Sequence, residues 1–517
     1  MAGSSSNPGC ARARLGRMPW PGPPDRFDGS VPVYDSLWIN GRATSASDGA
    51  TLETVDPATG EVVARFALGT ARDVDRAVRT ARTALSGPWG AMTPETRGRR
   101  LLDLAAACRV HAEPLAELET LDTGKPMAAS RGDVAGVAAT LTYNAGAADK
   151  LEGTTVPLGR GFVDFTEAEP LGVTAHITPW NFPLGMAVRS LAPALAAGCT
   201  AVIKPAEQTP FTTLALARLA ESTGFPPGVI NVVTGDGPGT GAAVAGHPGV
   251  NGVTFTGSVE TGRRVGAAAG QNLRPVVLEL GGKNPLIVFA DADLRAAVTT
   301  ALDGAFDNSG QVCSSVSRLL LDEDIAEAFL SRFVEEAGRL RVGPAHEEPD
   351  LGPLISHEQY DRVRTHLDSA AGGDAQFLLG EPLPAWIAGG YFVKPVVLEP
   401  ASLDSPVACE ETFGPVVTVF RFSGENEAVR IANRLPYGLA AGIYTARIDR
   451  ALGLARRLDV GTVWINGWFI GGVQAPTGGT KDSGFGRERG LEGIRSYLRI
   501  KNVGIEIGPA DSAASGS

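Results

Sequence analysis

Leu278-Glu-Leu-Gly-Gly-Lys-Asn284 follows directly on the apolar pair Val276-Val277 and places a carboxylate before two consecutive glycines. The run 276–280 predicts a short buried strand, because apolar runs bounded by turn residues are typical of strands inside a parallel sheet. Glu279 would then lie at the strand end, where a side chain can project into a cleft. Burial there would raise its pKa and suit it to act as a general base, and a solvated strand-end charge is the alternative.

Strand and helix signals alternate outward from this stretch in both directions. Toward the N-terminus the predicted helices are 73–85, 96–111 and 211–222, and the predicted strands are 169–177, 196–204, 229–234 and 250–256. Toward the C-terminus the predicted helices are 294–306, 325–336 and 425–433, and the predicted strands are 317–321, 416–422 and 462–465. The alternation predicts an α/β fold in which two closely packed domains each contain a largely parallel sheet.

Length and composition agree with this class of fold. The chain has 517 residues, which predicts two or three domains, and its 43% hydrophobic and 20% charged residues are ordinary for a globular protein. The formal net charge is −11, and an acidic chain lacks the clustered cations that nucleic-acid binding requires. The longest apolar region, 191–203, is interrupted by Pro193 and Gly198, so we predict no membrane span.

The cysteines are few and widely spaced: Cys10, Cys108, Cys199, Cys313 and Cys409. This spacing fits neither a disulfide framework nor a thiolate metal site, so we expect no metal and a reducing compartment, the cytoplasm. The ends, 1–30 and 508–517, are rich in small and polar residues and are predicted to be disordered tails. The first of them lacks the apolar core of a secretory signal.

A glycine pattern at 237–242 fits the loose dinucleotide fingerprint G-x-G-x-x-A, but we interpret it as a Gly-rich surface turn. Pro238 interrupts the pattern, and Glu260, the acid nearest the expected spacing, follows a Thr-Gly-Ser turn instead of ending a strand. The phosphates of any dinucleotide are therefore expected elsewhere.

Two polar loops supply further candidate chemistry. Cys313 lies in Asn308-Ser-Gly-Gln-Val-Cys-Ser-Ser315, where the N–H groups of a helix start could lower the pKa of a thiol. Asn181 lies in Thr178-Pro-Trp-Asn-Phe-Pro-Leu184, a rigid loop from which an amide could donate to an oxyanion. A buried structural cysteine and an Asx-turn asparagine are the alternatives. With Glu279 the set is coherent: a thiolate attacks a carbonyl, an amide holds the oxyanion, and a carboxylate activates water.

Together these segments resemble the NAD(P)-dependent aldehyde dehydrogenase superfamily, over about residues 35–504. E-L-G-G-K resembles the family's glutamate signature, with Glu279 at the base position, and N-x-G-Q-x-C resembles its cysteine signature, with Cys313 at the nucleophile position. Six further motifs appear in family order: T-P-W-N-F-P, K-P-A-E-Q-T-P, F-T-G-S-x-x-x-G, E-E-x-F-G-P-V, Y-G-L-A-A-G-I-Y and K-x-S-G-x-G-R-E-x-G.

The resemblance implies a Rossmann-like nucleotide-binding domain, a catalytic domain and an oligomerisation arm. Residues 31–147 and 171–281 would bind NAD, and 282–481 would carry the nucleophile. A β-hairpin arm at 148–170, with the segment 482–507, would join subunits into a homodimer or homotetramer, because a projecting hairpin is barely stable alone.

The resemblance also implies where NAD would bind. Lys204 and Glu207 would meet the adenine ribose, and Glu207 favours NAD over NADP because a carboxylate repels a 2′-phosphate. The helix that begins after Ser258 would face the pyrophosphate with its N–H groups. The other positions implied to contact the cofactor are Thr178, Pro179, Trp180, Phe255, Thr256, Gly257, Ser258, Gly262, Leu280, Glu411 and Phe413.

By the same resemblance, Cys313 would form a thiohemiacetal with an aldehyde, and hydride transfer to the nicotinamide would leave a thioester. Asn181 would help to hold the oxyanion, and Glu279 would activate the hydrolytic water that releases a carboxylic acid. The implied substrate tunnel is lined by Met186, Arg189, Val312, Trp468, Gly471 and Thr477.

Four of the tunnel or supporting positions depart from the family pattern. Gly471 and Thr477 replace frequent aromatic residues, and Ser190 replaces a frequent lysine, which predicts a wider and less apolar tunnel. Arg189 replaces a frequent tryptophan, and it either reads a substrate carboxylate or pairs with a neighbouring acid.

Alternative functions remain open beside NAD-dependent aldehyde oxidation. A CoA-acylating relative would typically lack the base, and Glu279 is present. An NADP-preferring relative is possible, since family members with this glutamate sometimes use both cofactors. A cofactor-independent esterase would leave the cofactor residues unexplained. A catalytically silent structural paralogue would be signalled by loss of Cys313, Glu279 or Asn181, and all three are present.

Overall fold

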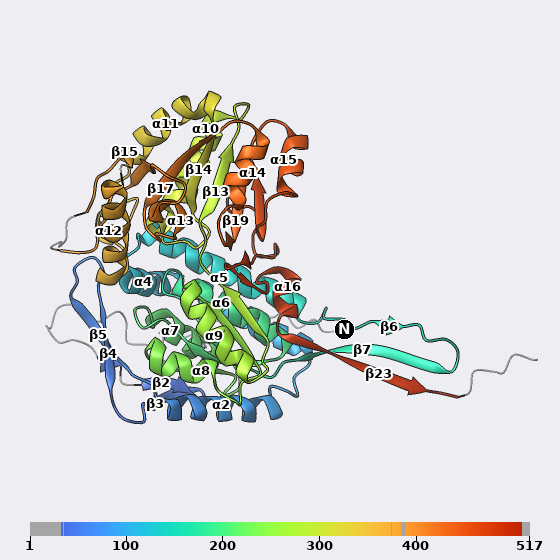
Figure 1. The fold of residues 1–517 in the computed structure, drawn as a ribbon. Coiled ribbons are helices and arrows are strands. Elements are labelled where there is room, and N and C mark those ends of the chain that lie inside the picture. Colours follow the sequence, from blue (N-terminus) through green and yellow to red (C-terminus); the bar gives the residue numbers. More distant parts are fainter. Residues whose placement is uncertain (1–32, 35, 374, 384–388, 509–517) are drawn as a thin grey trace, which may run out of the picture.

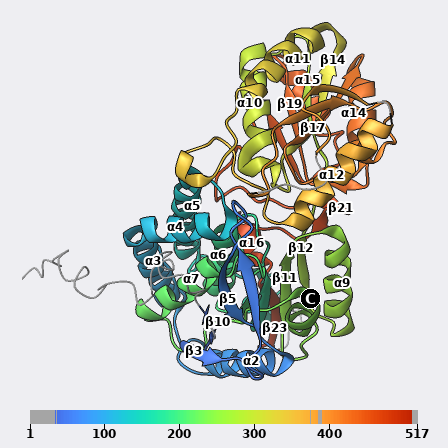
Figure 2. The same ribbon diagram turned by 90° about the vertical axis from the view of Figure 1, so that its left-hand side faces the viewer.

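The computed structural model describes residues 33–34, 36–373, 375–383 and 389–508, and the predicted tail 1–30 lies outside this part of the chain, as do residues 509–517. Two lobes lie one above the other, and a narrow arm projects from the lower one (Figures 1 and 2). Each lobe is built on one large sheet with helices on both faces. Within the described ranges, no helix combines the length and the apolar character needed to cross a membrane.

The first lobe is built on an eight-stranded sheet. Its strand order is β22 (Gly484–Phe485), β12 (Val276–Glu279), β11 (Gly252–Thr256), β8 (Val173–Ile177), β9 (Thr200–Lys204), β10 (Ile230–Val232), β2 (Ser36–Ile39) and β3 (Arg42–Ser45). The five strands from β12 to β10 are parallel, and β22 and β2 run antiparallel to them at either side. The carboxyl ends of the parallel strands therefore meet at one edge, where α/β proteins place their ligands.

Alternating side chains of the first sheet pack into two cores. Val202 of β9 belongs to one core, whereas its neighbours Ala201 and Ile203 belong to the other, as the period of two in a strand requires. The helices of the first core are α2 (Ala71–Ser86), α8 (Ala242–Ala245) and α9 (Val259–Gln271). Those of the second core are α3 (Pro94–Val110), α4 (Ala112–Thr123), α5 (Met127–Ala147), α6 (Pro183–Ala197) and α7 (Phe211–Ser222).

The second lobe is built on a seven-stranded sheet. Its order is β15 (Gln376–Leu379), β16 (Val396–Glu399), β17 (Val416–Phe422), β14 (Val316–Asp322), β13 (Asn284–Val288), β19 (Ala440–Tyr444) and β20 (Thr462–Ile465), and only β15 pairs antiparallel. Leu286 packs with α10 (Leu294–Phe306) and α11 (Glu323–Gly338), whereas Ile287 packs with α14 (Glu425–Asn433) and α15 (Ile448–Ala455). This lobe is therefore also covered on both faces.

The arm is a three-stranded sheet that joins distant parts of the chain. β7 (Phe162–Pro170) pairs antiparallel with β23 (Leu498–Glu506) along its whole length and with the short β6 (Thr155–Val156) near its tip. Apolar side chains remain exposed on it: Val156, Phe162, Val163, Ile500 and Ile505.

One long helix, α12 (His357–Gly372), and several short elements remain. The short elements are β1 (Val33–Tyr34), β4 (Thr51–Val55), β5 (Val62–Ala67), β18 (Tyr437–Gly438), β21 (Thr480–Lys481), α13 (Pro406–Cys409), α16 (Gly490–Arg495), and the turns η1 (Gly237–Gly241), η2 (Asp307–Gly310) and η3 (Ala345–Glu347).

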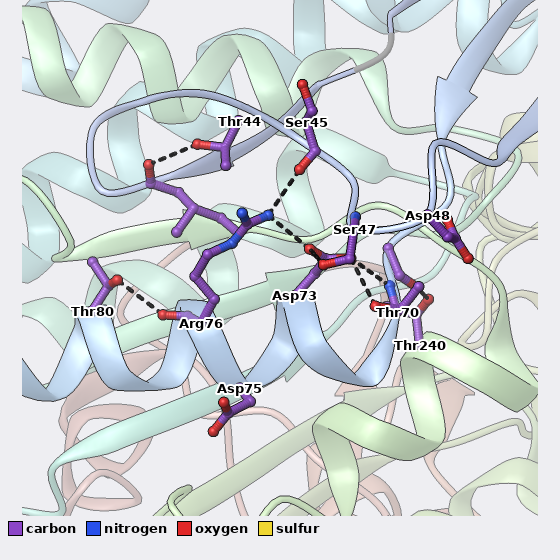
Figure 3. A network of polar contacts seen from close by, with 12 residues as sticks. Thr44, Ser45, Ser47, Asp48, Thr70, Asp73, Asp75, Arg76, Thr80 and Thr240 are labelled. Carbon is purple, nitrogen blue, oxygen red and sulfur yellow. Dashed lines mark hydrogen bonds and ion pairs between the residues drawn. The ribbon is translucent and has the colours of Figure 1, made fainter.

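A buried carboxylate fixes the start of α2. Asp73 accepts hydrogen bonds from the backbone and hydroxyl of Thr70 and of Ser47, and it forms a 2.7 Å ion pair with Arg76 (Figure 3). Burial by itself raises the pKa of the Asp73 carboxyl, but these hydrogen bonds outweigh it, so the pKa lies below its usual value. The loop before the helix is thereby tied to its first turn.

Most predicted elements lie where the sequence placed them, and the α/β fold is confirmed. The helices at 211–222 and 425–433 and the strands at 416–422 and 462–465 have the predicted bounds. Two predictions were wrong in part. The strand predicted at 169–177 is two strands, because the chain leaves β7 and turns at Gly172 with φ +125° before β8 begins. The strand predicted at 196–204 begins in α6, which continues to Ala197.

Candidate active site

A cavity of about 1190 Å³ is lined by residues of both lobes. The first lobe contributes the carboxyl ends of its parallel strands, including Lys204 and Glu279. The second lobe contributes the turn that carries Cys313 and the loop that carries Glu411. The predicted chemical groups are therefore gathered in one place from segments far apart in sequence.

Cys313 lies in a turn between η2 and β14, and its side chain is partly accessible to the cavity. Asn284 donates hydrogen bonds of 2.9 Å to the carbonyls of Cys313 and Ser315, and this fixes the backbone of the turn. Burial raises the pKa of the Cys313 thiol to about 11, and the nearby Arg189 lowers it only in part. Of the two settings considered for this cysteine, a polar loop and a helix start, the structure shows the polar loop, so no helix N–H groups lower the pKa of the thiol.

Asn181 is buried beside this turn and lines the same cavity. Its side-chain Nδ2 donates to the carbonyl of Gln311 at 2.9 Å, so the amide is held two residues from the cysteine. Within the described residues, the second N–H of this amide donates to no acceptor. It is the donor available for an oxygen atom that develops negative charge in the cavity.

A buried lysine, which the sequence analysis missed, supports the Asn181 loop. Lys125 Nζ donates to the carbonyl of Asn181 at 2.9 Å and to Asp133 at 2.8 Å, and it lies 4.3 Å from the ring centre of Phe182. Glu119 lies 3.8 Å from the same ammonium group. The network therefore holds the loop that presents Asn181.

Glu279 occupies the last position of β12, as predicted, and it is buried. One carboxylate oxygen, Oε1, has no hydrogen-bond partner among the described residues. Burial and the charge of Glu488 raise the pKa of Glu279 to about 8, while Arg189 lowers it. A Cβ atom at Gly478 would lie 2.8 Å from Oε1, so the glycine leaves room for this oxygen. A buried carboxyl with a pKa near 8 can exchange a proton at neutral pH.

Arg189 contacts two acidic side chains of the protein itself. Its Nε forms an ion pair with Glu488, its Nη2 donates to Thr477 at 3.0 Å, and Nη2 lies 3.8 Å from Glu279 Oε2. Of the two interpretations of Arg189 from the sequence, this geometry matches the pairing with a neighbouring acid.

The same cavity also contains the residues implied to hold a nucleotide. Lys204 Nζ forms a 2.7 Å ion pair with Glu207, and the first residues of α9 line the cavity beside them. Trp180 and Phe413 meet edge to face with ring centres 5.2 Å apart. Glu411 accepts a 3.1 Å hydrogen bond from the backbone of Gly282.

Four of the predicted contact residues do not line the cavity. Gly262 and Leu280 face each other beneath it, since a Cβ at Gly262 would lie 2.5 Å from the Leu280 side chain. Trp468 lies behind the cysteine turn, where it donates to the carbonyl of Ser314 at 3.0 Å, and Gly471 also lies off the surface of the cavity. The remaining predicted residues line it: Thr178, Pro179, Trp180, Met186, Arg189, Phe255, Thr256, Gly257, Ser258, Val312 and Thr477, with those named above.

The glycine turn at 237–241 lines the cavity as well, so its interpretation as a surface turn was incomplete. Its backbone N–H groups nevertheless point inward. Asp236 accepts hydrogen bonds from the N–H groups of Gly239 and Thr240 through its side chain and from Gly241 through its carbonyl. Three donors that a phosphate would need are therefore already engaged.

Comparison with known proteins places the chain in one family. The family model described as "Aldehyde dehydrogenase family" matches residues 44–503. A hydroxyisobutyraldehyde dehydrogenase of Mycolicibacterium austroafricanum is 43% identical over 93% of this chain and 95% of its own length. Human retinaldehyde dehydrogenase 3 is 42% identical over 94% of this chain and 97% of its own.

Solved structures agree with this assignment. The NAD+ complex of an aldehyde dehydrogenase from Bacillus cereus superposes with a TM-score of 0.90 at 39% identity, and the match covers 92% of this chain and 97% of that one. The fold and the site thus define an α/β oxidoreductase with its active site between two lobes. The chain belongs to the aldehyde dehydrogenase family, and aldehyde oxidation is its class of reaction.

Proposed function

We propose that this protein oxidises an aldehyde to a carboxylic acid with NAD, using Cys313 as nucleophile, Asn181 in the oxyanion hole and Glu279 as the base. The observation that carries the proposal is the convergence of these three side chains on one cavity that is also lined by Lys204, Glu207 and Glu411. Complexes of related solved structures with NAD+ support the choice of cofactor.

The cavity has features that fit the dinucleotide. Lys204 and Glu207 would meet the adenine ribose, the start of α9 would face the pyrophosphate, and Glu411 and Phe413 would position the nicotinamide. Gly281 leaves space beside Glu411, since a Cβ there would lie 2.2 Å from its carboxylate. Bound NAD would supply a hydride acceptor.

The residues of this chain would perform the other steps. The Cys313 sulfur attacks the aldehyde carbon, and the free N–H of Asn181 with the backbone N–H of Cys313 stabilises the oxyanion. The thiol is protonated at neutral pH, so its proton must leave to a base. Glu279 is a titratable carboxylate in the same cavity, and it would take this proton and pass it to solvent before its second role. After the hydride departs, Glu279 activates water, which hydrolyses the thioester.

We propose that three parts of the chain have separate roles. Residues 31–147 and 171–281 bind nucleotide, and 282–481 carry the nucleophile. The arm, 148–170 with 482–507, joins subunits into a homodimer or homotetramer in the cytoplasm. The exposed apolar side chains of β7 and β23 support the arm's role, because they have no partner within the described part of this subunit that would cover them.

NADH formation, followed by absorbance without CoA, tests the proposal. The panel contains aliphatic, aromatic and carboxylate-bearing aldehydes, with NAD and with NADP, and it compares the wild type with Cys313→Ala. We expect NADH from the wild type alone. A requirement for CoA would favour the acylating alternative, and ester hydrolysis without NAD as the sole activity would favour the esterase. Failure to bind NAD in a titration would favour the silent paralogue.

A further inference from the structure

Arg489 is a cation that the protein's own structure leaves without a partner. It lines the cavity that Cys313 and Arg189 also line. Within the described ranges its guanidinium takes part in no hydrogen bond and no ion pair, although Arg189, Arg487 and Arg495 nearby in space or sequence all have partners. A guanidinium presents five donors, so its capacity to bind an acceptor is wholly unused.

The backbone at Arg489 is strained, and hydrogen bonds of its neighbours hold it in this conformation. Arg489 has φ +59° and ψ 169°, a region that favours glycine and costs about 1–3 kcal/mol for other residues. Two hydrogen bonds of 2.9 Å between Thr477 and Glu488 fix the residue before it, and Gly490 donates to the carbonyl of Val473 after it. Val473 and Thr477 line the cavity, so the strained residue is anchored to the tunnel wall on both sides.

The neighbouring acids do not neutralise the positive charge of Arg489. Arg189 takes up the charge of Glu488 through its ion pair and lies 3.8 Å from Glu279. The charge of Arg189, followed by burial, lowers the pKa of Arg489 to about 10, so Arg489 remains a cation at neutral pH. Glu279 is largely protonated at that pH, since its pKa is about 8. Arg489 therefore has no carboxylate of the protein paired with it in the described part of the chain, and its positive charge suits one anion.

We propose that Arg489, and not Arg189, binds a carboxylate of the substrate, so that the protein prefers aldehydes that carry an acid group away from the aldehyde carbon. The proposal rests on the proposed function and deepens it by naming the substrate class. A carboxylate would accept paired N–H bonds from the free guanidinium, which is the geometry in which arginine recognises carboxylates most strongly. Arg189 instead forms an ion pair with Glu488 and a hydrogen bond with Thr477, and it is a positioning residue.

The test compares succinic semialdehyde with its methyl ester, which has a similar length and no charge. In the wild type we expect a higher kcat/KM for the acid. Arg489→Met should lower the ratio of kcat/KM for acid to ester by about 10- to 100-fold, since a hydrogen bond to a charged group contributes about 1.5–3 kcal/mol. Arg489→Lys should restore part of the ratio. Arg495→Met is the matched control, because Arg495 is exposed and paired with Glu492, and it should leave the ratio at its wild-type value.

Homologous pairs with three and four methylene groups belong in the same panel, because the span from Cys313 to Arg489 selects one length. A preference for the ester at every length in the wild type, or an equal loss of acid and ester in Arg489→Met, overturns the proposal. If no aldehyde is oxidised at all, the proposed function fails separately. Binding of glutarate, measured by calorimetry on wild type and Arg489→Met with NAD present, then decides this proposal: weaker binding by the variant supports it, and equal binding overturns it.

Discussion

Arg189 Nη2 lies 3.8 Å from Glu279 Oε2, while Arg189 Nε pairs with Glu488, so one arginine contacts two buried acids. Burial and Glu488 raise the pKa of Glu279 to about 8, and Arg189 opposes this rise. The arginine thus keeps the proposed base within reach of deprotonation at physiological pH.

The pH dependence of turnover should report this relationship. Glu279 must be a carboxylate to activate water, so kcat for a neutral aldehyde should rise with pH around a midpoint near 8. Arg189→Met removes the opposing positive charge and should move the midpoint upward. Arg189→Lys keeps the charge and should stay closer to the wild type. A midpoint that is unchanged or lower in Arg189→Met would show that the guanidinium does not act on Glu279.

Glu279→Gln should separate the two halves of the reaction. The variant keeps Cys313 and the oxyanion donors but has no base for hydrolysis, so the thioester should accumulate. We expect a burst of about one NADH per active site followed by turnover slowed by two or more orders of magnitude. Rapid mixing gives the burst, and intact-mass spectrometry detects the acyl group. Retention of wild-type steady-state turnover would remove Glu279 from its proposed role.

Glu207→Gln should relax the discrimination between cofactors. Glu207 is partly exposed and paired with Lys204 at 2.7 Å, and its carboxylate would repel a 2′-phosphate. Removing the charge frees the lysine for that phosphate, so the ratio of kcat/KM for NADP to NAD should rise by about tenfold. The exposed Glu221 lies on α7 away from the cavity, and Glu221→Gln is the control that should leave the ratio unchanged. A ratio that stays constant in Glu207→Gln would place the adenosine elsewhere.

Asp73→Asn should destabilise the first lobe without altering the active site. The change weakens the cap of α2 and the ion pair with Arg76, which we expect to cost about 1–2 kcal/mol at neutral pH. The folded-state pKa of Asp73 is depressed, so its contribution is present above the usual carboxyl pKa and lost as pH falls through the folded pKa. The gap in Tm between wild type and variant should therefore close below about pH 4. Asp75→Asn, which alters an exposed pair with Arg79, is the control and should shift Tm little.

The sequence predicted best those parts of the molecule that depend on local pattern. The strand 416–422 and the helix 425–433 have the predicted bounds because their apolar spacing and flanking turns agree with their environment. The strand 169–177 was predicted as one element because apolar residues continue on both sides of Gly172. In the structure β7 pairs with β23 in the arm, whereas β8 belongs to the first sheet.

The chemistry of the site was predicted less completely, because burial is a property of the fold. Cys313, Glu279 and Asn181 were found from short motifs, but the thiol's raised pKa arises from burial by both lobes. Lys125 is almost fully buried, yet a lone lysine in a sequence normally indicates a surface position. Arg489 was missed because its lack of a partner can be seen only after every neighbouring acid has been placed.

The pairing of β7 with β23 also determines when the arm can form during synthesis of the chain. Glu169 and Arg499 are bonded across this pairing although 330 positions separate them in the chain. A growing polypeptide exposes β7 long before its partner strand β23 has been synthesised. β7 therefore has no partner strand while most of the chain is being made, and the arm is complete only once β23 has emerged from the ribosome.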